Sequence, residues 1–401
     1  MKTALIVIVI LESDALLTSV VGADKVLMRW AYAALMVGSL FLTFFKLSIA
    51  KKSAKNIYFF YPILIFLVVF LVSAGSAFFI FPKPISDWLP SLYAYAPIFI
   101  FYFFYIIGAK EKELATAFML TAVIISTLLL GDRLFNFTFL NEYQRLSSFF
   151  GQGARRIVLL KNEVIFGLVI LASLIMFGKQ TAGKKLFLII VAVFLFFVQT
   201  IIMESRLGFL AIAVAFCSLL YLAGITKKSL GISVAAIAGA LIILPTVFAQ
   251  YIDKMMGMSI SDDSSNIGVR IESIMYLFKL YADSNGWGVG MMSPTGSTNN
   301  VLYPGTAFNV ADTGVFSSLG QFGILGFLLW FTLTFKCFST FRKIFNRSEK
   351  RNYFSAACYA FLMSFTISLL PLSLFTQAWN ITMGGTLLYI LWLYNSRNKA
   401  I

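Results

Sequence analysis

Arginines and carboxylates stand together where polar segments of the chain meet long apolar runs. Asp312 lies at the end of the longest polar stretch, directly before the apolar run 313–335. Glu204 and Arg206 occupy a tight turn between two apolar runs, and Arg270 lies within the polar stretch itself. Arginine binds phosphate oxygens through a planar, bidentate fork, and ionised residues at membrane depth are costly enough to indicate function. This arrangement predicts chemistry on an anionic, lipid-borne substrate.

A second group of arginines lies in the polar segment 132–161. Several of them flank the aromatic and glycine-rich stretch 149–153, whose rings could stack on sugars while arginine holds phosphate. Any single arginine could instead pair with a nearby acid or a lipid headgroup, and Lys161 and Glu163 are expected to be interfacial charges. The residues expected to bind pyrophosphate or sugar are Arg133, Arg145, Arg155, Arg156 and Glu272.

Arg270 shares the apolar stripe of an expected helix over residues 267–283, capped by Asn266 or a nearby Ser or Asp. The stripe comprises Arg270, Ile274, Leu277 and Tyr281. A charge on a buried stripe needs a partner, which is either a phosphate in a cavity or a salt bridge to Glu272 or Asp283, both off the stripe. The helix is expected to stop at 285–290, where three glycines let the chain turn and approach a ligand closely.

Asp312 has two interpretations. A carboxylate at a helix N-terminus is favoured by the helix dipole, so Asp312 could simply cap the span that begins at Thr313. Alternatively it acts on a substrate at the membrane face. Three glycines further along this span are expected to let it pack tightly against neighbouring helices: Gly320, Gly323 and Gly326.

The composition indicates a membrane protein. Of 401 residues, 60% are hydrophobic and 16% aromatic, in repeated apolar runs of about 20 residues. The net charge of +15 does not indicate nucleic-acid binding, because the basic residues form short clusters between apolar runs. The chain has no histidine, and its three cysteines suit neither a metal site nor an obvious disulfide. We therefore expect no metal and no cofactor.

We expect an all-α, polytopic membrane protein that forms a single integral membrane domain over 1–401. The expected spans are 3–21, 27–49, 57–80, 92–109, 114–131, 162–177, 186–203, 207–225, 230–250, 313–335, 353–372 and 381–395. The first span resembles a cleavable signal peptide, but a retained helix is favoured because the next span follows at once.

Lysine-rich loops share one side, which places both termini in the cytoplasm. The loops 132–161 and 251–311 then lie in the periplasm, the larger one containing short helices.

These features resemble the O-antigen polymerase/ligase superfamily of bacterial envelopes, which includes Wzy-type polymerases and lipopolysaccharide O-antigen ligases. The resemblance covers most of the chain by topology, about twelve transmembrane helices in a GT-C-like fold with a long outer loop. The turn 205–208 looks like the family's Ser-Arg-Gly turn, Arg270 like its loop arginine, and 286–290 like its glycine-rich turn. The spacing from Arg156 to Gly167 resembles an arginine–ten–glycine pattern of polymerases.

One departure distinguishes the members of the superfamily. The ligase segment begins His-Asn and leads to a Gly-x-x-Gly element, and counting back from Gly323 and Gly326 puts Asp312 at the histidine's place. Because the chain has no histidine, the resemblance favours a polymerase, whose segment often begins with Asp. An O-antigen ligase remains an alternative, as does a lipid-linked oligosaccharide flippase, although no related halves are visible and the loop 251–311 is long. An envelope structural or regulatory protein would not need arginines at three outer positions.

The resemblance implies metal-independent glycosyl transfer in the bacterial inner membrane. Undecaprenyl-pyrophosphate-linked repeat units would be joined at the periplasmic face, with inversion. Arg206 and Arg270 would stabilise the leaving pyrophosphate, Asp312 would orient or deprotonate the acceptor hydroxyl, and Glu204 is a reserve carboxylate. A polysaccharide chain-length regulator is implied as a partner by the resemblance alone.

Overall fold

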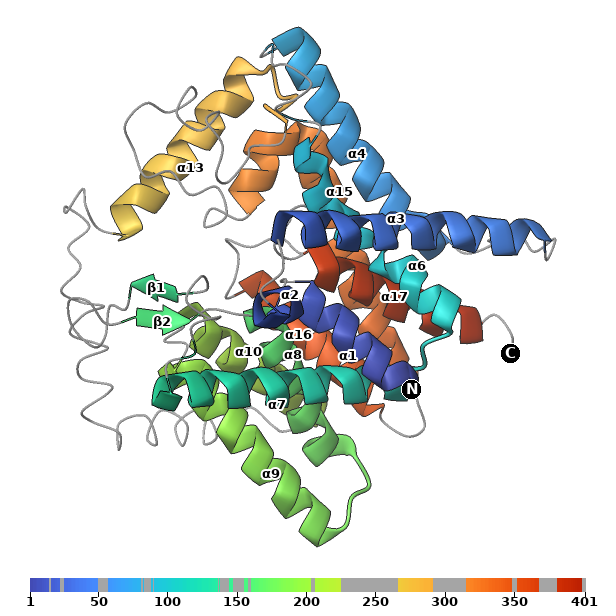
Figure 1. Cartoon of the computed structure of the whole chain (residues 1–401), viewed down its shortest axis with the longest axis vertical. Coiled ribbons are helices and arrows are strands. Elements are labelled where there is room, and N and C mark those ends of the chain that lie inside the picture. The colour runs from blue at the N-terminus through green and yellow to red at the C-terminus, as the bar shows by residue number, and fades with distance from the viewer. Residues whose placement is uncertain are drawn as a thin grey trace. The chain divides into compact units, whose positions relative to one another are not determined.

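Figure 1 shows the helices and strands of the structure, a computed structural model. The chain divides into two compact units. Unit 1 comprises 1–114, 269–340 and 369–401, and unit 2 comprises 115–268 and 341–368. The described residues are 1–13, 16–21, 25–49, 57–80, 82, 88, 90–135, 137, 144–146, 155–157, 160–202, 206–224, 266–290, 315–347, 352–367 and 381–398.

Unit 1 is built from helices that come from both ends of the chain. Its elements are α1 (Lys2–Glu12), α2 (Leu16–Val21), α3 (Lys25–Ile49), η1 (Ile57–Phe59), α4 (Tyr61–Gly75), the π-helix η2 (Ser76–Ile80), the 3-10 helix η3 (Pro90–Phe99), α6 (Ile100–Ile107), α13 (Asn266–Asp283), most of α15 (Val315–Arg347) and α17 (Ile381–Asn398). In its core, α3 and α17 both pack on η3 and α6.

An aromatic cluster fills this core. The run 98–107 is apolar on every side, as expected of a helix that is buried all round. Tyr102 donates a 2.7 Å hydrogen bond to the Phe59 carbonyl, and Tyr389 donates one of 2.8 Å to the Ala109 carbonyl. Gly385 has no side chain where the Ile98 carbonyl approaches α17. Both of these tyrosine hydroxyls thus have a partner, and the glycine allows the backbones to come close.

Unit 2 is centred on α8 (Lys161–Phe177), which is buried along 163–173. Around it are α7 (Glu111–Phe135), α9 (Ala182–Phe197), the π-helix η5 (Val198–Ile202), α10 (Arg206–Leu222) and α16 (Tyr353–Ile367). Phe166 of α8 lies 4.9 Å from Phe118 and 4.8 Å from Phe361, measured between ring centroids. Both α8 and α10 pack on α16, which completes the core of this unit.

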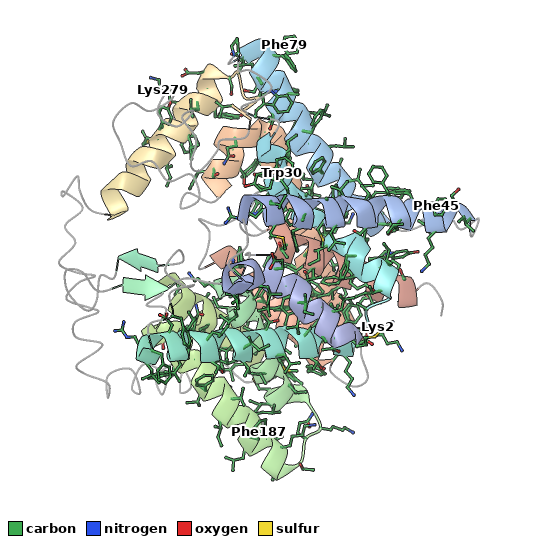
Figure 2. All side chains as sticks on the ribbon, in the orientation of Figure 1. Lys2, Trp30, Phe45, Phe79, Phe187 and Lys279 are labelled. Atoms are coloured by element: carbon green, nitrogen blue, oxygen red, sulfur yellow. The ribbon has the colours of Figure 1, made fainter. Side chains whose placement is uncertain are left out.

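The surface of the helices is apolar, as lipid contact requires. Large side chains such as Phe45 on α3, Phe79 on η2 and Phe187 on α9 are 65%, 88% and 63% exposed and point outward (Figure 2). In the described part of the chain, five helices are long and apolar enough to cross a membrane: Leu27–Ile49, Tyr61–Ile80, Glu111–Phe135, Ala182–Thr200 and Phe316–Asn346. Three shorter apolar helices accompany them. The chain is therefore a multi-pass membrane protein, and the predicted fold class is confirmed.

Helices overlap every expected span except 230–250, which lies outside the described residues. Two details differ from expectation. The helix expected over 313–335 continues through the basic residues to Arg347, because its cations follow the apolar stretch without a helix-breaking residue. Within the expected loop 132–161, β1 (Gln144–Leu146) and β2 (Arg155–Ile157) pair as a short antiparallel ribbon.

Gly167 has a packing role that can be tested. A Cβ atom at this position would lie 2.5 Å from the Ala122 Cβ and 2.7 Å from the Phe118 carbonyl oxygen, so α7 and α8 approach closely there. We expect Gly167→Ala to destabilise unit 2 by about 1–3 kcal/mol through overpacking. The measurement is thermal unfolding of the purified protein in detergent. Gly183→Ala on α9, where nothing lies within 4 Å, is the matched control, and equal melting of both variants would contradict this role.

Candidate active site

The helix α15 is broken at Gly323. Its backbone is helical on both sides, but Gly323 has φ 60° and ψ −155°, a conformation open essentially to glycine alone. In an unbroken helix, the Gly320 and Gln321 carbonyls would accept hydrogen bonds from residues four positions later. The break removes these bonds inside a candidate membrane span, where unpaired backbone groups cost several kcal/mol. These backbone groups therefore need partners from elsewhere.

The turn that follows α13 supplies the partners. Val289 N–H donates to the Gly320 carbonyl at 3.0 Å, and Gly290 N–H donates to the Gln321 carbonyl at 2.8 Å. In return, Ile324 N–H donates to the Gly286 carbonyl at 3.1 Å. Three backbone hydrogen bonds thus join the turn to both sides of the break. We call this arrangement of residues 286–290 and 320–324 the glycine junction.

Glycine is required on both sides of the junction. Gly286, Gly288 and Gly290 all have positive φ, at 80°, 92° and 75°. A Cβ on Gly288 would lie 2.5 Å from both the Gln321 carbonyl oxygen and the Gly323 nitrogen. A Cβ on Gly323 would meet the Gly286 and Trp287 carbonyl oxygens just as closely. The sequence predicted that these glycines let the chain turn and approach a ligand closely. In the structure they let the turn approach the glycine-rich stretch of α15, and the close approach to a ligand stays a prediction.

The turn also rests on α4. The indole of Trp287 covers Gly75, at which a Cβ would lie 2.9 Å from the Trp287 Nε1, and a Cβ on Gly290 would lie 2.8 Å from the Ser73 Cα. Within the turn, Ser284 is buried and its hydroxyl accepts a 2.9 Å hydrogen bond from Gly288 N–H. The same hydroxyl donates to the Tyr281 carbonyl at 2.9 Å. The junction is therefore fixed by α15, α4 and the end of α13.

The helix α13 begins and ends close to the predicted positions. Of the predicted stripe, Leu277 is buried against Gly320, whereas Ile274 and Tyr281 are half-buried and the Tyr281 hydroxyl lies near Gly286. Leu280, which is off that stripe, is also buried. Phe278 adds a ring contact of 5.5 Å with Phe316. Arg270 lies two turns before Leu277 in α13.

Of the three carboxylates predicted for the site, only Glu272 lies among the described residues. Asp312 and Glu204 lie outside the described residues, and for Glu272 the structure gives the position in α13. Asp312 precedes Val315, the first residue of α15, by three positions. The two interpretations of Asp312, cap or substrate contact, both stay predictions.

In unit 2 the structure brings three predicted arginines together. The ribbon pairs Arg145 directly with Arg156, and Leu146 with Arg155. The register therefore places Arg145 and Arg156 at directly paired positions of the two strands. Arg206 is the first residue of α10, where the helix dipole is positive, and Arg133 lies exposed in the last turn of α7. Arg206 and the ribbon belong to unit 2, whereas Arg270 belongs to unit 1.

Sequence reasoning missed one carboxylate. Glu163, expected to be an interfacial charge, is buried with 6% of its surface exposed in the first turn of α8. A buried carboxylate in a membrane protein is a candidate functional group, and this one follows the arginine ribbon by only six residues. Its signal in the sequence is a single acid directly before a long apolar run. Among the described residues, no group of three His, Cys, Asp or Glu side chains is arranged to hold a metal ion.

A comparison with family models places these features in a known context. Residues 191–331 match the O-antigen ligase family. The match confirms the resemblance to the O-antigen polymerase/ligase superfamily over this part of the chain. It contains both glycine segments of the junction together with Arg206, Arg270 and Asp312, whereas Arg133 and the ribbon precede it. A comparison with curated proteins finds no match to the chain.

Proposed function

We propose that the chain is an O-antigen polymerase of the bacterial inner membrane. It joins undecaprenyl-pyrophosphate-linked repeat units at the periplasmic face during lipopolysaccharide synthesis, with both termini in the cytoplasm. The observation that carries this proposal is the family match over 191–331, combined with a chain that contains no histidine. The ligase segment of the superfamily begins with a histidine, and Asp312 occupies that place.

The proposed reaction is a displacement at the anomeric carbon of the growing glycan. A sugar hydroxyl of a single lipid-linked repeat unit forms the new carbon–oxygen bond, and the bond to undecaprenyl pyrophosphate breaks. The electron pair of that bond leaves with the pyrophosphate, so negative charge develops there, and Arg206 and Arg270 are suited to stabilise it. Asp312 accepts the hydroxyl proton or orients the hydroxyl.

The arginine ribbon supports the same proposal. Arg145 and Arg156 occupy paired positions of the ribbon, with Arg155 at the neighbouring position, and are proposed to bind a pyrophosphate or the charged groups of a glycan. Arg133 and Glu272 are proposed to bind the substrate further out, and Glu204 is a reserve proton acceptor. A chain-length regulator is the proposed protein partner.

The second candidate is an O-antigen ligase, because the matching family carries that description. The two activities leave different products in a strain that lacks the gene. Loss of a polymerase leaves lipid A–core carrying a single repeat unit, whereas loss of a ligase leaves bare core and polymer on undecaprenyl pyrophosphate. Loss of a flippase leaves bare core and unpolymerised repeat units inside the cell.

The test is deletion of the gene followed by gel analysis of lipopolysaccharide. We expect core plus one repeat unit, and restoration of the full ladder by the wild-type gene. If the deletion strain has bare core and retains polymer on the lipid carrier, the protein is a ligase and not a polymerase. An unchanged ladder in the deletion strain would refute both activities.

A further inference from the structure

We propose that the glycine junction is a positioning device. It holds α13, the helix that carries Arg270, in a fixed place against the first part of α15, which Asp312 precedes in the chain. This proposal rests on the proposed function, because it assigns the junction a role in assembling that site. The turn and the broken helix lie more than 30 residues apart in the chain, yet their backbone groups satisfy each other. The junction thus replaces helical hydrogen bonds of α15 by bonds to the end of α13.

The contacts fix the sense in which α13 crosses α15. Leu277 lies at Gly320, and the end of α13, through Gly286, lies at Ile324. α13 and the first part of α15 therefore run in the same direction past each other. Consequently the N-terminal parts of both helices lie on the same side of the junction. Arg270 is about 10 Å upstream of Leu277, and Val315 is about 7 Å upstream of Gly320, at 1.5 Å per helical residue.

Within unit 1, α13 and the first part of α15 meet at the junction and through Leu277 and Phe278. Asp312 precedes Val315, the first residue of α15, by three positions in the chain. A shift of the junction would therefore move α13, the helix that carries Arg270, relative to the start of α15. A displacement of about 1 Å at such a site costs about 100-fold in rate.

The tightness of the junction makes it a fixed support. Ser284 holds the turn in shape, and Gly288 contacts the backbone of α15 with no room for a side chain. The atoms that a new Cβ would meet are backbone atoms, which cannot rotate away. An alanine at Gly288 must push α13 and α15 apart, whereas an alanine at Gly38 on α3 meets nothing within 4 Å.

The experiment measures the contact between α13 and α15 directly. In the full chain, Leu277→Cys and Gly320→Cys place two thiols where the Leu277 Cβ lies 3.0 Å from an ideal Cβ on Gly320. A small adjustment reaches the Cβ separation of about 3.8 Å that a disulfide needs. Oxidation in membrane vesicles is followed by counting free thiols with a mass tag. Each single-cysteine variant controls for pairing with Cys217, Cys337 or Cys358.

We expect rapid crosslinking with an intact junction, and crosslinking about tenfold slower after Gly288→Ala, the factor that corresponds to a contact weakened by ~1.4 kcal/mol. Gly38→Ala should leave the rate unchanged. Ser284→Ala removes the hydroxyl but adds no bulk, so it should slow crosslinking less than Gly288→Ala does. If the Gly288 variant does not accumulate in the membrane, the Ser284 variant provides the test. An unchanged rate in both junction variants would overturn the proposal.

A rescue experiment links the junction to the reaction. Gly288→Ala is expected to shorten or abolish the O-antigen ladder, the disulfide between positions 277 and 320 to restore it, and a reductant to remove it again. The amount of folded protein in the membrane is measured in parallel, because a disulfide that only restored folding would raise this amount together with the ladder. A crosslinked variant that stays inactive would overturn the positioning role. If the deletion strain keeps its ladder while Gly288→Ala still slows crosslinking, the proposed function is wrong. In that case the junction still holds α13 against α15.

Discussion

Arg270→Ala is expected to abolish the long-chain O-antigen ladder while the protein still accumulates in the membrane. Removing one preorganised donor to a developing negative charge costs about 10²–10³-fold in rate. Arg270 stands on the stripe of α13 that includes Leu277, which is buried against Gly320. The cost should therefore fall on the reaction rather than on folding, because the packing of the stripe survives without the guanidinium.

Two further variants make this prediction specific. Arg270→Lys keeps the positive charge but loses the planar fork, so it should recover little activity. Lys279→Ala removes an exposed cation from the same helix and should leave the ladder intact. The measurement is complementation of the deletion strain at matched expression, with band intensities compared across the ladder. A normal ladder with Arg270→Ala would exclude Arg270 from the pyrophosphate site.

The helix that carries Arg270 could be predicted from the sequence because its signals are local. Asn266 marks its start, an apolar stripe with helical spacing runs through it, and a glycine-rich turn ends it. The structure places α13 at Asn266–Asp283, with Leu277 of the stripe buried and Tyr281 half-buried. Short-range patterns of this kind need no knowledge of the rest of the fold.

The junction could not be predicted in the same way. The turn at 286–290 and the glycines of α15 each fit a general explanation, a tight turn and a tightly packed helix. Their pairing depends on the break at Gly323, which is a property of two segments together. No local signal separates a glycine that allows helix packing from one that ends a run of helical hydrogen bonds. Gly320, packed on Leu277, and Gly323, at the break, are neighbours with these two different roles.

The environment of a charge is equally hard to predict from its neighbours in sequence. Lys161 and Glu163 are two residues apart in the first turn of α8, yet Glu163 is buried and Lys161 is partly exposed. Burial depends on which helices surround the first turn of α8. The register that opposes Arg145 and Arg156 is another long-range property, since the residues between the two strands form no periodic pattern.

Asp312→Asn is expected to remove polymerisation with little effect on the amount of folded protein. Asn and Ser cap helices about as well as Asp, because each offers a side-chain oxygen to the first free N–H groups. Neither accepts a proton from a sugar hydroxyl at neutral pH. If Asp312 is the proton acceptor, both Asp312→Asn and Asp312→Ser should lower the rate by about 10²–10⁴-fold, the usual contribution of general base catalysis.

The same pair of variants tests the alternative that Asp312 only caps α15. In that case Asn and Ser should both support a normal ladder, whereas Asp312→Ala should lower the stability by about 1 kcal/mol. Asp283→Asn, which changes an exposed carboxylate at the end of α13, controls for the loss of a negative charge in unit 1. The readouts are the ladder and the melting temperature in detergent. Activity lost with an unchanged melting temperature assigns Asp312 to the reaction. Capping needs only a side-chain oxygen, which Asn and Ser keep, whereas proton transfer needs the carboxylate, which they lack.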